Sequence, residues 1–146
     1  MEAKSGMGER VAPSFSWRTR VYWEDTDAGG VVYHASYLRF FERARTEWLR
    51  ARGIDQLRLR ETSGVLFVVR DMRIAFRRAA RLDDELDITA TVSRQRAASM
   101  EFAQSLTRVA DGVLIAEADV RVACIDADRF VPAAIPAALL PGISAT

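Results

Sequence analysis

The chain has 146 residues, with 21 basic and 20 acidic side chains and a formal net charge of +1. This is about the length of one domain, and it can bury a core without disulfides or metals. The balanced charge excludes nucleic-acid binding through bulk charge. Cys124 is the single cysteine and His34 the single histidine, which excludes an internal disulfide and a multi-histidine metal site within one chain.

The two ends of the chain differ from its middle. Residues 1–16 are small and polar and lack the apolar segment of a secretory signal. Residues 132–146 are rich in Ala and Pro, which predicts a short helix or coil ending in a loose tail. We therefore expect a flexible leader over 1–16, one domain over 17–140 and a tail over 141–146. No apolar run is long enough to span a membrane, and a cytoplasmic location is the simplest expectation.

The first half of the domain contains one pronounced helical pattern. Residues 17–23 are β-branched and aromatic and predict a strand, and 24–30 are dense in Asp and Gly and predict a loop. After a short apolar step, residues 35–52 predict a long amphipathic helix that stops at Gly53. Its apolar face consists of Tyr37, Leu38, Phe40, Phe41, Ala44, Trp48 and Ala51.

The second half alternates with a period of two after a weaker helical stretch at 54–61. Its predicted strands are 65–77, 85–96, 100–109 and 114–126. Asp111-Gly112 is a strong hairpin signal, and Cys124 falls on an apolar strand face that places it in the core. This order predicts an α+β domain in which an antiparallel sheet wraps one helix. Because such a sheet has edge strands, we expect a homodimer with a continuous sheet.

Residues that could carry chemistry gather at the start of the long helix. They are Asp25, Asp27, Gly29, Gly30, Tyr33 and His34. A helix N-terminus offers free N–H groups to an oxyanion, and a nearby carboxylate can attack a carbonyl or activate water. The cluster is therefore compatible with an acyl-transfer site. An ordinary Asp-Gly turn with a packing histidine, or a metal held by Asp25, Asp27 and His34, fits the same residues.

The segment that spans residues 20–50 carries a family resemblance. Its sequence, RVYWEDTDAGGVVYHASYLRFFERARTEWLR, closely resembles the signature of hotdog-fold acyl-CoA thioesterases. The Tol–Pal-associated acyl-CoA thioesterases are the most similar group, and 4-hydroxybenzoyl-CoA thioesterase is a more distant one. The resemblance covers roughly residues 16–132. It implies a hotdog fold, a long central helix wrapped by a five-stranded antiparallel sheet, that hydrolyses acyl-CoA to free acid and CoA without a cofactor.

The same resemblance implies roles for individual residues. Asp27 matches the family's catalytic carboxylate, acting as nucleophile or general base. His34 matches the position whose backbone N–H polarises the thioester carbonyl, and its imidazole is implied to be catalytic as well. Asp25 is expected to brace the loop. The residues expected to contact substrate are Tyr22, Trp23, Gly29, Gly30, Val31, Tyr33, Arg94 and Arg96.

Two positions depart from the family pattern. Trp23 stands where relatives usually have a second tyrosine, so a role that needs the hydroxyl is in doubt while an aromatic wall survives. Ser36 stands where they usually have Asn, and serine remains a good residue for a helix start.

Arginines and partners complete the expectations. Arg94 and Arg96, beside the turn at 97–99, are the first candidates to bind the phosphates of CoA, and Arg77 and Arg78 are the next. Acyl-CoA, a second copy of the chain in a dimer or tetramer, and peripheral association with an envelope complex are the expected partners. A hotdog hydratase or dehydratase and a non-catalytic acyl-binding module are the alternative functions.

Overall fold

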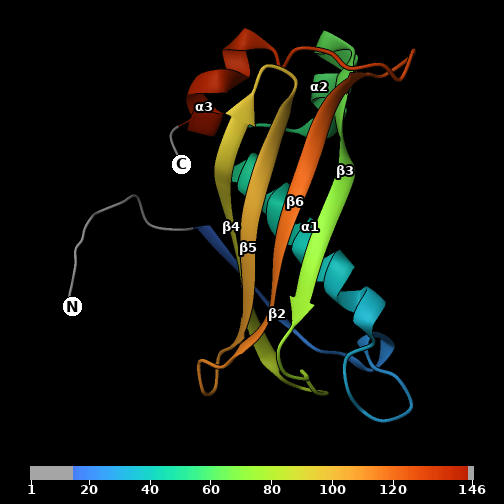
Figure 1. Cartoon of the computed structure of the whole chain (residues 1–146), viewed down its shortest axis with the longest axis vertical. Helices are drawn as coiled ribbons and strands as arrows, with labels where there is room; N and C mark the ends of the chain where they lie inside the picture. Colours follow the sequence, from blue (N-terminus) through green and yellow to red (C-terminus); the bar gives the residue numbers. More distant parts are fainter. Residues whose placement is uncertain (1–14, 145–146) are drawn as a thin grey trace, which may run out of the picture.

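The computed structural model describes residues 15–144, and their main feature is one antiparallel sheet wrapped around one helix (Figure 1). The sheet has five strands in the order β2-β4-β5-β6-β3. Their bounds are β2 Phe15–Arg20, β3 Val65–Phe76, β4 Glu85–Arg96, β5 Ser99–Arg108 and β6 Leu114–Asp126. The long helix α1, His34–Ala51, crosses the inner face of the sheet. The hotdog architecture expected from the sequence is confirmed.

The core lies between α1 and the sheet. Tyr37, Phe40, Phe41, Ala44 and Trp48 are buried, as their spacing predicted, because they fall on the helix face that meets the strands. Trp48 contacts Phe102 of β5 edge to face, with ring centroids 5.2 Å apart. For two residues of the predicted apolar face, burial was wrongly predicted: Leu38 is 44% exposed and Ala51 is exposed. They lie at the border of the buried stripe, where the sheet no longer covers the helix.

Local hydrogen bonds explain where the sequence boundaries were wrong. The first strand ends at Arg20 rather than at Trp23, because Trp23–Asp25 forms the 3-10 helix η1 and the Asp25 carboxylate accepts the Tyr22 N–H. Helix α2, Gln56–Ser63, begins later than predicted, because Asp55 caps it by accepting the N–H groups of its first turn.

Both ends of the described chain differ from the expected boundaries. Residues 1–14 of the expected leader lie outside the described residues, and Phe15 and Ser16 already belong to β2. At the other end, the 3-10 helix η2, Ala137–Leu139, leads into α3, Leu140–Ser144. Ile143 is buried, so the chain stays packed beyond residue 140, where a loose tail was expected.

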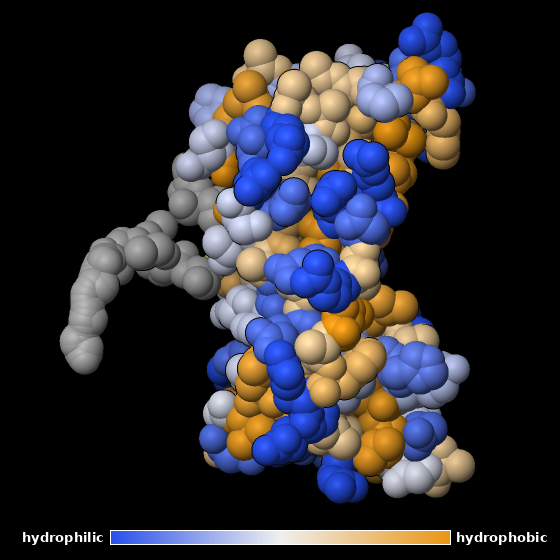
Figure 2. Space-filling model, in the orientation of Figure 1, coloured by the Kyte–Doolittle hydropathy of each residue, from blue (hydrophilic) through white to orange (hydrophobic). Residues whose placement is uncertain are grey.

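The outer face of the sheet is polar. Hydrophilic side chains run down the middle of this face in Figure 2. Ion pairs link side chains across β3 and β6, such as Arg77 with Glu117 at 2.7 Å and Arg121 with Asp71 at 3.6 Å. The apolar residues of each strand therefore point to the helix side, and the functional residues have to be sought along the rim of that inner face.

Candidate active site

The Asp-Gly loop folds into a tight hairpin just before α1. The N–H of Asp27 donates to the Val31 carbonyl at 2.9 Å, and the N–H of Gly30 donates to the Asp27 carbonyl at 3.1 Å. Thr26 and Val32 pair as an antiparallel bridge at its base. Gly30 has φ +79°, a conformation that favours glycine. This hairpin fixes the backbone of Asp27 seven residues before His34.

The Asp27 side chain is exposed and held by its own loop. Its Oδ1 accepts the N–H of Gly29 at 2.8 Å. A Cβ added at Gly29 would lie 3.2 Å from that same oxygen, closer than most real Cβ contacts. Gly29 therefore permits the close approach that orients the carboxylate, while the second oxygen has no protein partner among residues 15–144.

Asp25 connects the loop to the helix. The residue is buried, and its Oδ2 accepts the Tyr22 N–H at 2.8 Å. Its backbone carbonyl accepts the Tyr33 N–H at 2.9 Å and the hydroxyl of Ser36 at 3.1 Å. These bonds give Asp25 the bracing position expected of it, and they show that Ser36 makes a helix-start contact at the position where Asn was usual.

His34 is the first residue of α1. Its ring is exposed and lies against the ring of Tyr33, with centroids 4.5 Å apart. Its backbone N–H has no hydrogen-bond partner within the described part of the chain, as is normal for the first N–H groups of a helix. The helix dipole adds partial positive charge at this point. The His34 amide is thus a free donor suited to a developing oxyanion.

A cavity of about 290 Å³ opens beside His34, between the start of α1 and the end of β3. It is lined by Val32, His34, Tyr37, Phe76, Arg77, Arg78 and Ala79. The Tyr37 ring is 5.4 Å from that of Phe76, and its hydroxyl oxygen accepts the Ala80 N–H at 3.1 Å. Burial raises the pKa of Tyr37, so the phenol is protonated at neutral pH and serves as a fixed wall.

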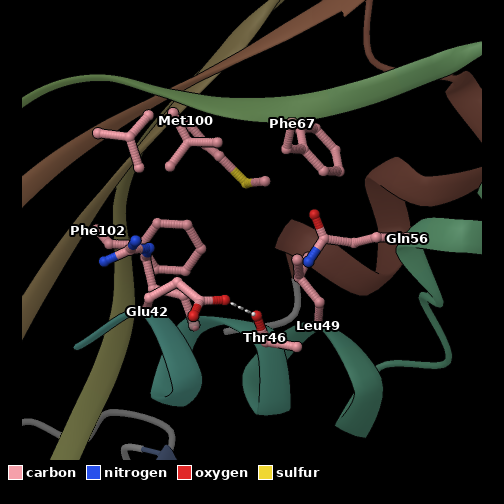
Figure 3. Close-up of a pocket in the computed structure, with 10 residues that line it drawn as sticks. Glu42, Thr46, Leu49, Gln56, Phe67, Met100 and Phe102 are labelled. Atoms are coloured by element: carbon pink, nitrogen blue, oxygen red, sulfur yellow. Dashed lines mark hydrogen bonds between the residues drawn. The ribbon is translucent and has the colours of Figure 1, made fainter. Parts of the chain in front are cut away.

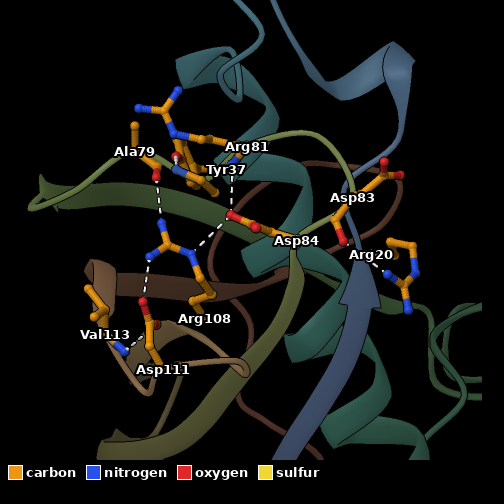
Figure 4. A network of polar contacts seen from close by, with 10 residues as sticks. Arg20, Tyr37, Ala79, Arg81, Asp83, Asp84, Arg108, Asp111 and Val113 are labelled. Atoms are coloured by element: carbon orange, nitrogen blue, oxygen red, sulfur yellow. Dashed lines mark hydrogen bonds and ion pairs between the residues drawn. The ribbon is translucent and has the colours of Figure 1, made fainter.

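Arg108, which the sequence did not single out, supports the segment 77–84 that borders this cavity. Arg108 of β5 donates to the Asp84 carboxylate at 3.0 Å, to the Ala79 carbonyl at 2.9 Å and to Asp111 at 3.0 Å (Figure 4). Both carboxylates raise the pKa of Arg108. Residues 77–84 in turn hold the Asp-Gly hairpin, since the N–H of Val32 donates to the Ala80 carbonyl at 2.8 Å. In the sequence, the Asp83-Asp84 turn was the signal that could have pointed to this hydrogen-bond network.

Several predicted site residues lie apart from this cavity in the single chain. Tyr22 and Trp23 are 61% and 76% exposed beside the loop, and neither they nor Asp27 line the cavity. Arg94 and Arg96 are exposed at the far end of β4, about 30–36 Å along the strand from the end that adjoins the loop. Arg77 and Arg78, the second choice for phosphate binding, are the arginines that the structure places beside His34.

Residues 15–144 show neither a metal-binding cluster nor a membrane-spanning helix. No group of three or more His, Cys, Asp or Glu in that range lies where it could hold a metal ion. No helix in that range is long and apolar enough to cross a membrane. The absence of a cofactor stays a prediction from the sequence.

Comparison with known proteins identifies the family. Residues 21–143 match the thioesterase-like superfamily. The acyl-CoA thioester hydrolase YbgC of Escherichia coli O6:H1 is 46% identical over 86% of this chain and 92% of its own length. The acyl-CoA thioesterase YbgC of Haemophilus influenzae is 48% identical over 84% of this chain and 88% of its own.

A solved structure agrees with these sequence relatives. A probable thioesterase from Bartonella henselae superposes with a TM-score of 0.80 at 37% identity, covering 85% of this chain and all of that one. The fold and the sequence that carry the loop, the helix start and the cavity are thus similar to those of thioesterases. The chain belongs to the thioesterase-like superfamily and is a thioester hydrolase with the hotdog fold.

Proposed function

We propose that the protein hydrolyses acyl-CoA to a free acid and CoA at the cavity beside His34. The observation that supports this most is the unpartnered His34 N–H at the start of α1, with the exposed Asp27 carboxylate on the hairpin that leads into it. Relatives named as acyl-CoA thioester hydrolases supply the substrate class. Their names also favour hydrolysis over hydration or mere acyl binding.

The reaction needs one carboxylate and one oxyanion donor. As general base, Asp27 accepts a proton from water while the water oxygen attacks the thioester carbon. The carbonyl oxygen becomes negative against the His34 N–H, the C–S bond then breaks, and the thiolate sulfur takes up the proton. As nucleophile, Asp27 forms a mixed anhydride that water hydrolyses to the same products. Gly29, Gly30 and Val31 shape the backbone next to the thioester in either case.

The decisive variant is Asp27→Asn. It keeps the size of the side chain, and Asn can still accept the Gly29 N–H, but it removes the charge. We expect thiol release from acyl-CoA to fall by about 10²–10⁴ while acyl-CoA binding and the melting temperature stay near wild type. Asp55→Asn is the matched control, because Asn caps α2 as well as Asp does. Undiminished turnover in Asp27→Asn would refute the assignment.

We further propose that the site is completed by a second copy of the chain paired through β3. β3 is a twelve-residue edge strand, and its inner-face side chains Val69 and Phe76 are 47% and 52% exposed. Antiparallel pairing of two β3 edges would continue the sheet and cover those side chains. A clean monomer in gel filtration at micromolar concentration would contradict this.

Pairing through β3 also gives Arg94 and Arg96 a role. Because the two sheets would run in opposite directions, the end of one sheet that carries these arginines would meet the His34 end of the other. We propose that they bind the CoA phosphates in the partner's site, with Arg77 and Arg78 acting in their own. Tyr22, Trp23 and Tyr33 would form the aromatic rim. The exposed ring of His34 is proposed to assist proton transfer.

Mixing two inactive variants tests this sharing of residues between chains. Asp27→Asn chains co-expressed with Arg94→Gln/Arg96→Gln chains form mixed dimers, each with one intact site. We expect co-expression to restore about a quarter of wild-type activity at random pairing. Activity of the co-expressed chains no higher than that of the more active single variant would refute the sharing of residues between chains. Assembly into tetramers, a cytoplasmic location and association with an envelope complex stay predictions from the sequence.

A further inference from the structure

A second cavity lies farther along α1 and is not used by the mechanism above. It has a volume of about 100 Å³ and lies between α1 and the sheet. Figure 3 shows Glu42, Thr46 and Leu49 on the helix facing Phe67 and Met100 across it, with Gln56 of α2 at one side.

One buried cation lines this otherwise mostly apolar space. Arg45 is only 6% exposed, yet no carboxylate lies within ion-pair distance of it in residues 15–144. Its Nη1 donates to the Gln104 Oε1 at 3.0 Å, and no other partner of the guanidinium occurs within that range. The Arg45 nitrogens that lack a protein partner are accessible to solvent rather than enclosed by protein atoms. A guanidinium has five N–H donors, so Arg45 presents unused donors at the cavity.

An acceptor lies beside these donors. Glu42 lines the same cavity, and one of its carboxylate oxygens accepts the Thr46 hydroxyl at 2.9 Å. Burial lowers the pKa of Arg45 to about 10 and Glu42 acts against that shift, so Arg45 is charged at neutral pH. The pair offers N–H donors and a free carboxylate oxygen at one place, which suits a neutral group that both accepts and donates. A hydroxyl fits, whereas a carboxylate would meet the charge of Glu42 and a methyl group would leave Arg45 unsolvated.

Exposed apolar side chains mark a path along α1 from the proposed catalytic amide toward the cavity. Arg45 comes eleven residues after His34, about three turns, which returns it to the same face of α1. Leu38 lies between them, and it is 44% exposed. Phe76 at the His34 end and Val69 at the Arg45 end are inner-face residues of β3 that are exposed in the single chain and border this path. The second copy that we propose at β3 would enclose the path from that side. An acyl chain that starts at the His34 N–H can therefore run along α1 over apolar side chains.

The length of that path sets the length of the acyl chain that would fit it. The Arg45 Cα lies about 16 Å beyond that of His34 along the helix axis, and its long side chain leans back toward the N-terminus by about one turn. The guanidinium is therefore about 11 Å from the level of the His34 amide. An extended chain advances about 1.2 Å per bond, which makes this about nine bonds.

We propose that the cavity at Arg45 binds a hydroxyl at the far end of the acyl group, so that the enzyme prefers ω-hydroxyacyl-CoA of about eight to ten carbons. The hydroxyl accepts from Arg45 and donates to Glu42. This inference rests on the proposed placement of the thioester at His34. A hydrogen bond to a charged group, in a cavity that is partly open, predicts a preference of about 10- to 100-fold in kcat/KM over the unsubstituted chain of the same length.

The test compares matched acyl-CoAs on wild type and variants. ω-Hydroxy, unsubstituted and ω-carboxy acyl-CoAs of six to twelve carbons are followed by thiol release. The wild type is expected to prefer the hydroxy series, with its maximum near eight to ten carbons. Arg45→Met and Glu42→Met should bring the hydroxy-to-unsubstituted ratio close to one. Glu42 is exposed, so its variant should fold even if Arg45→Met leaves Gln104 unpaired and unstable. Glu47→Met, on the same helix but outside the cavity, should keep the wild-type ratio.

Other results would overturn the inference. Equal or better turnover of unsubstituted acyl-CoA by wild type, preference for the ω-carboxy series, or an unchanged ratio in Glu42→Met each refute it. If no acyl-CoA is hydrolysed, the proposed function fails instead. The Kd ratio of hydroxy and unsubstituted acyl-CoA, measured by calorimetry on the Asp27→Asn variant, then still decides whether the cavity selects a hydroxyl.

Discussion

The roles of the His34 backbone and of its ring can be separated by two substitutions at one position. His34→Ala removes the imidazole and keeps the N–H, whereas His34→Pro removes both. Proline is tolerated at the first position of a helix, where the N–H has no helical partner. Tyr33, the preceding residue, has φ −64° and ψ 136°, the extended conformation that a following proline requires. His34→Pro therefore deletes the amide donor at small cost to the fold.

The expected magnitudes differ enough to be decisive. Loss of one oxyanion donor lowers kcat by about 10²–10³. Thiol release with a saturating acyl-CoA should therefore fall about 100-fold or more from His34→Ala to His34→Pro, at similar melting temperature. If both variants lose the same activity relative to wild type, the amide has no role and the ring does the work. A change below about twofold in His34→Ala would restrict His34 to its backbone, because loss of a general acid or base costs about 10²–10⁴.

Four further substitutions test the architecture of the loop. Gly30→Ala should lower the free energy of unfolding by about 1–2 kcal/mol in urea titration, because its φ is +79°. Gly29→Ala should leave stability closer to wild type but lower kcat, because its Cβ would crowd the Asp27 Oδ1; a fully active variant would contradict that reading. Asp25→Ala should cost about 1–3 kcal/mol by leaving the Tyr22 N–H without its partner. Arg108→Met should release Asp84 and the Ala79 carbonyl, costing about 1–2 kcal/mol in the same titration and raising KM.

Periodicity predicted most of the fold because the pattern and the packing have the same cause. The strands Glu85–Arg96 and Leu114–Asp126 begin and end where alternation begins and ends, since one face of each meets α1. The errors occur where a single side chain redirects the backbone. The Asp25 carboxylate turns the chain out of β2, and the Asp55 carboxylate delays α2. A hydropathy pattern carries no information about such bonds.

The candidate site divides in the same way. The positions of Asp27 in the loop and His34 at the helix start could be predicted because the two are close in sequence, and local hydrogen bonds fix their backbones. Tyr37 and Phe76 could not be assigned to the site, because their meeting depends on how β3 crosses α1, and each reads as a core residue in its own element. Arg45 was hidden for a related reason: a charged residue on a helix is expected at the surface, and only the sheet packed over it shows otherwise.

The arginines show why the site that we propose to form between two chains is difficult to predict from one sequence. Residue type favours all of them equally for phosphate, and the turn beside Arg94 and Arg96 made those two attractive. In one chain they lie at the far end of the sheet, while Arg77 and Arg78 border the cavity at His34. Both pairs can serve one substrate only if two sheets run in opposite directions side by side. The exposed inner-face residues of β3 point to the same arrangement, because burying Val69 and Phe76 requires a strand beyond that edge. The free edge, the open cavity and the distant pair of arginines are therefore all consistent with the second copy of the chain that we propose at β3.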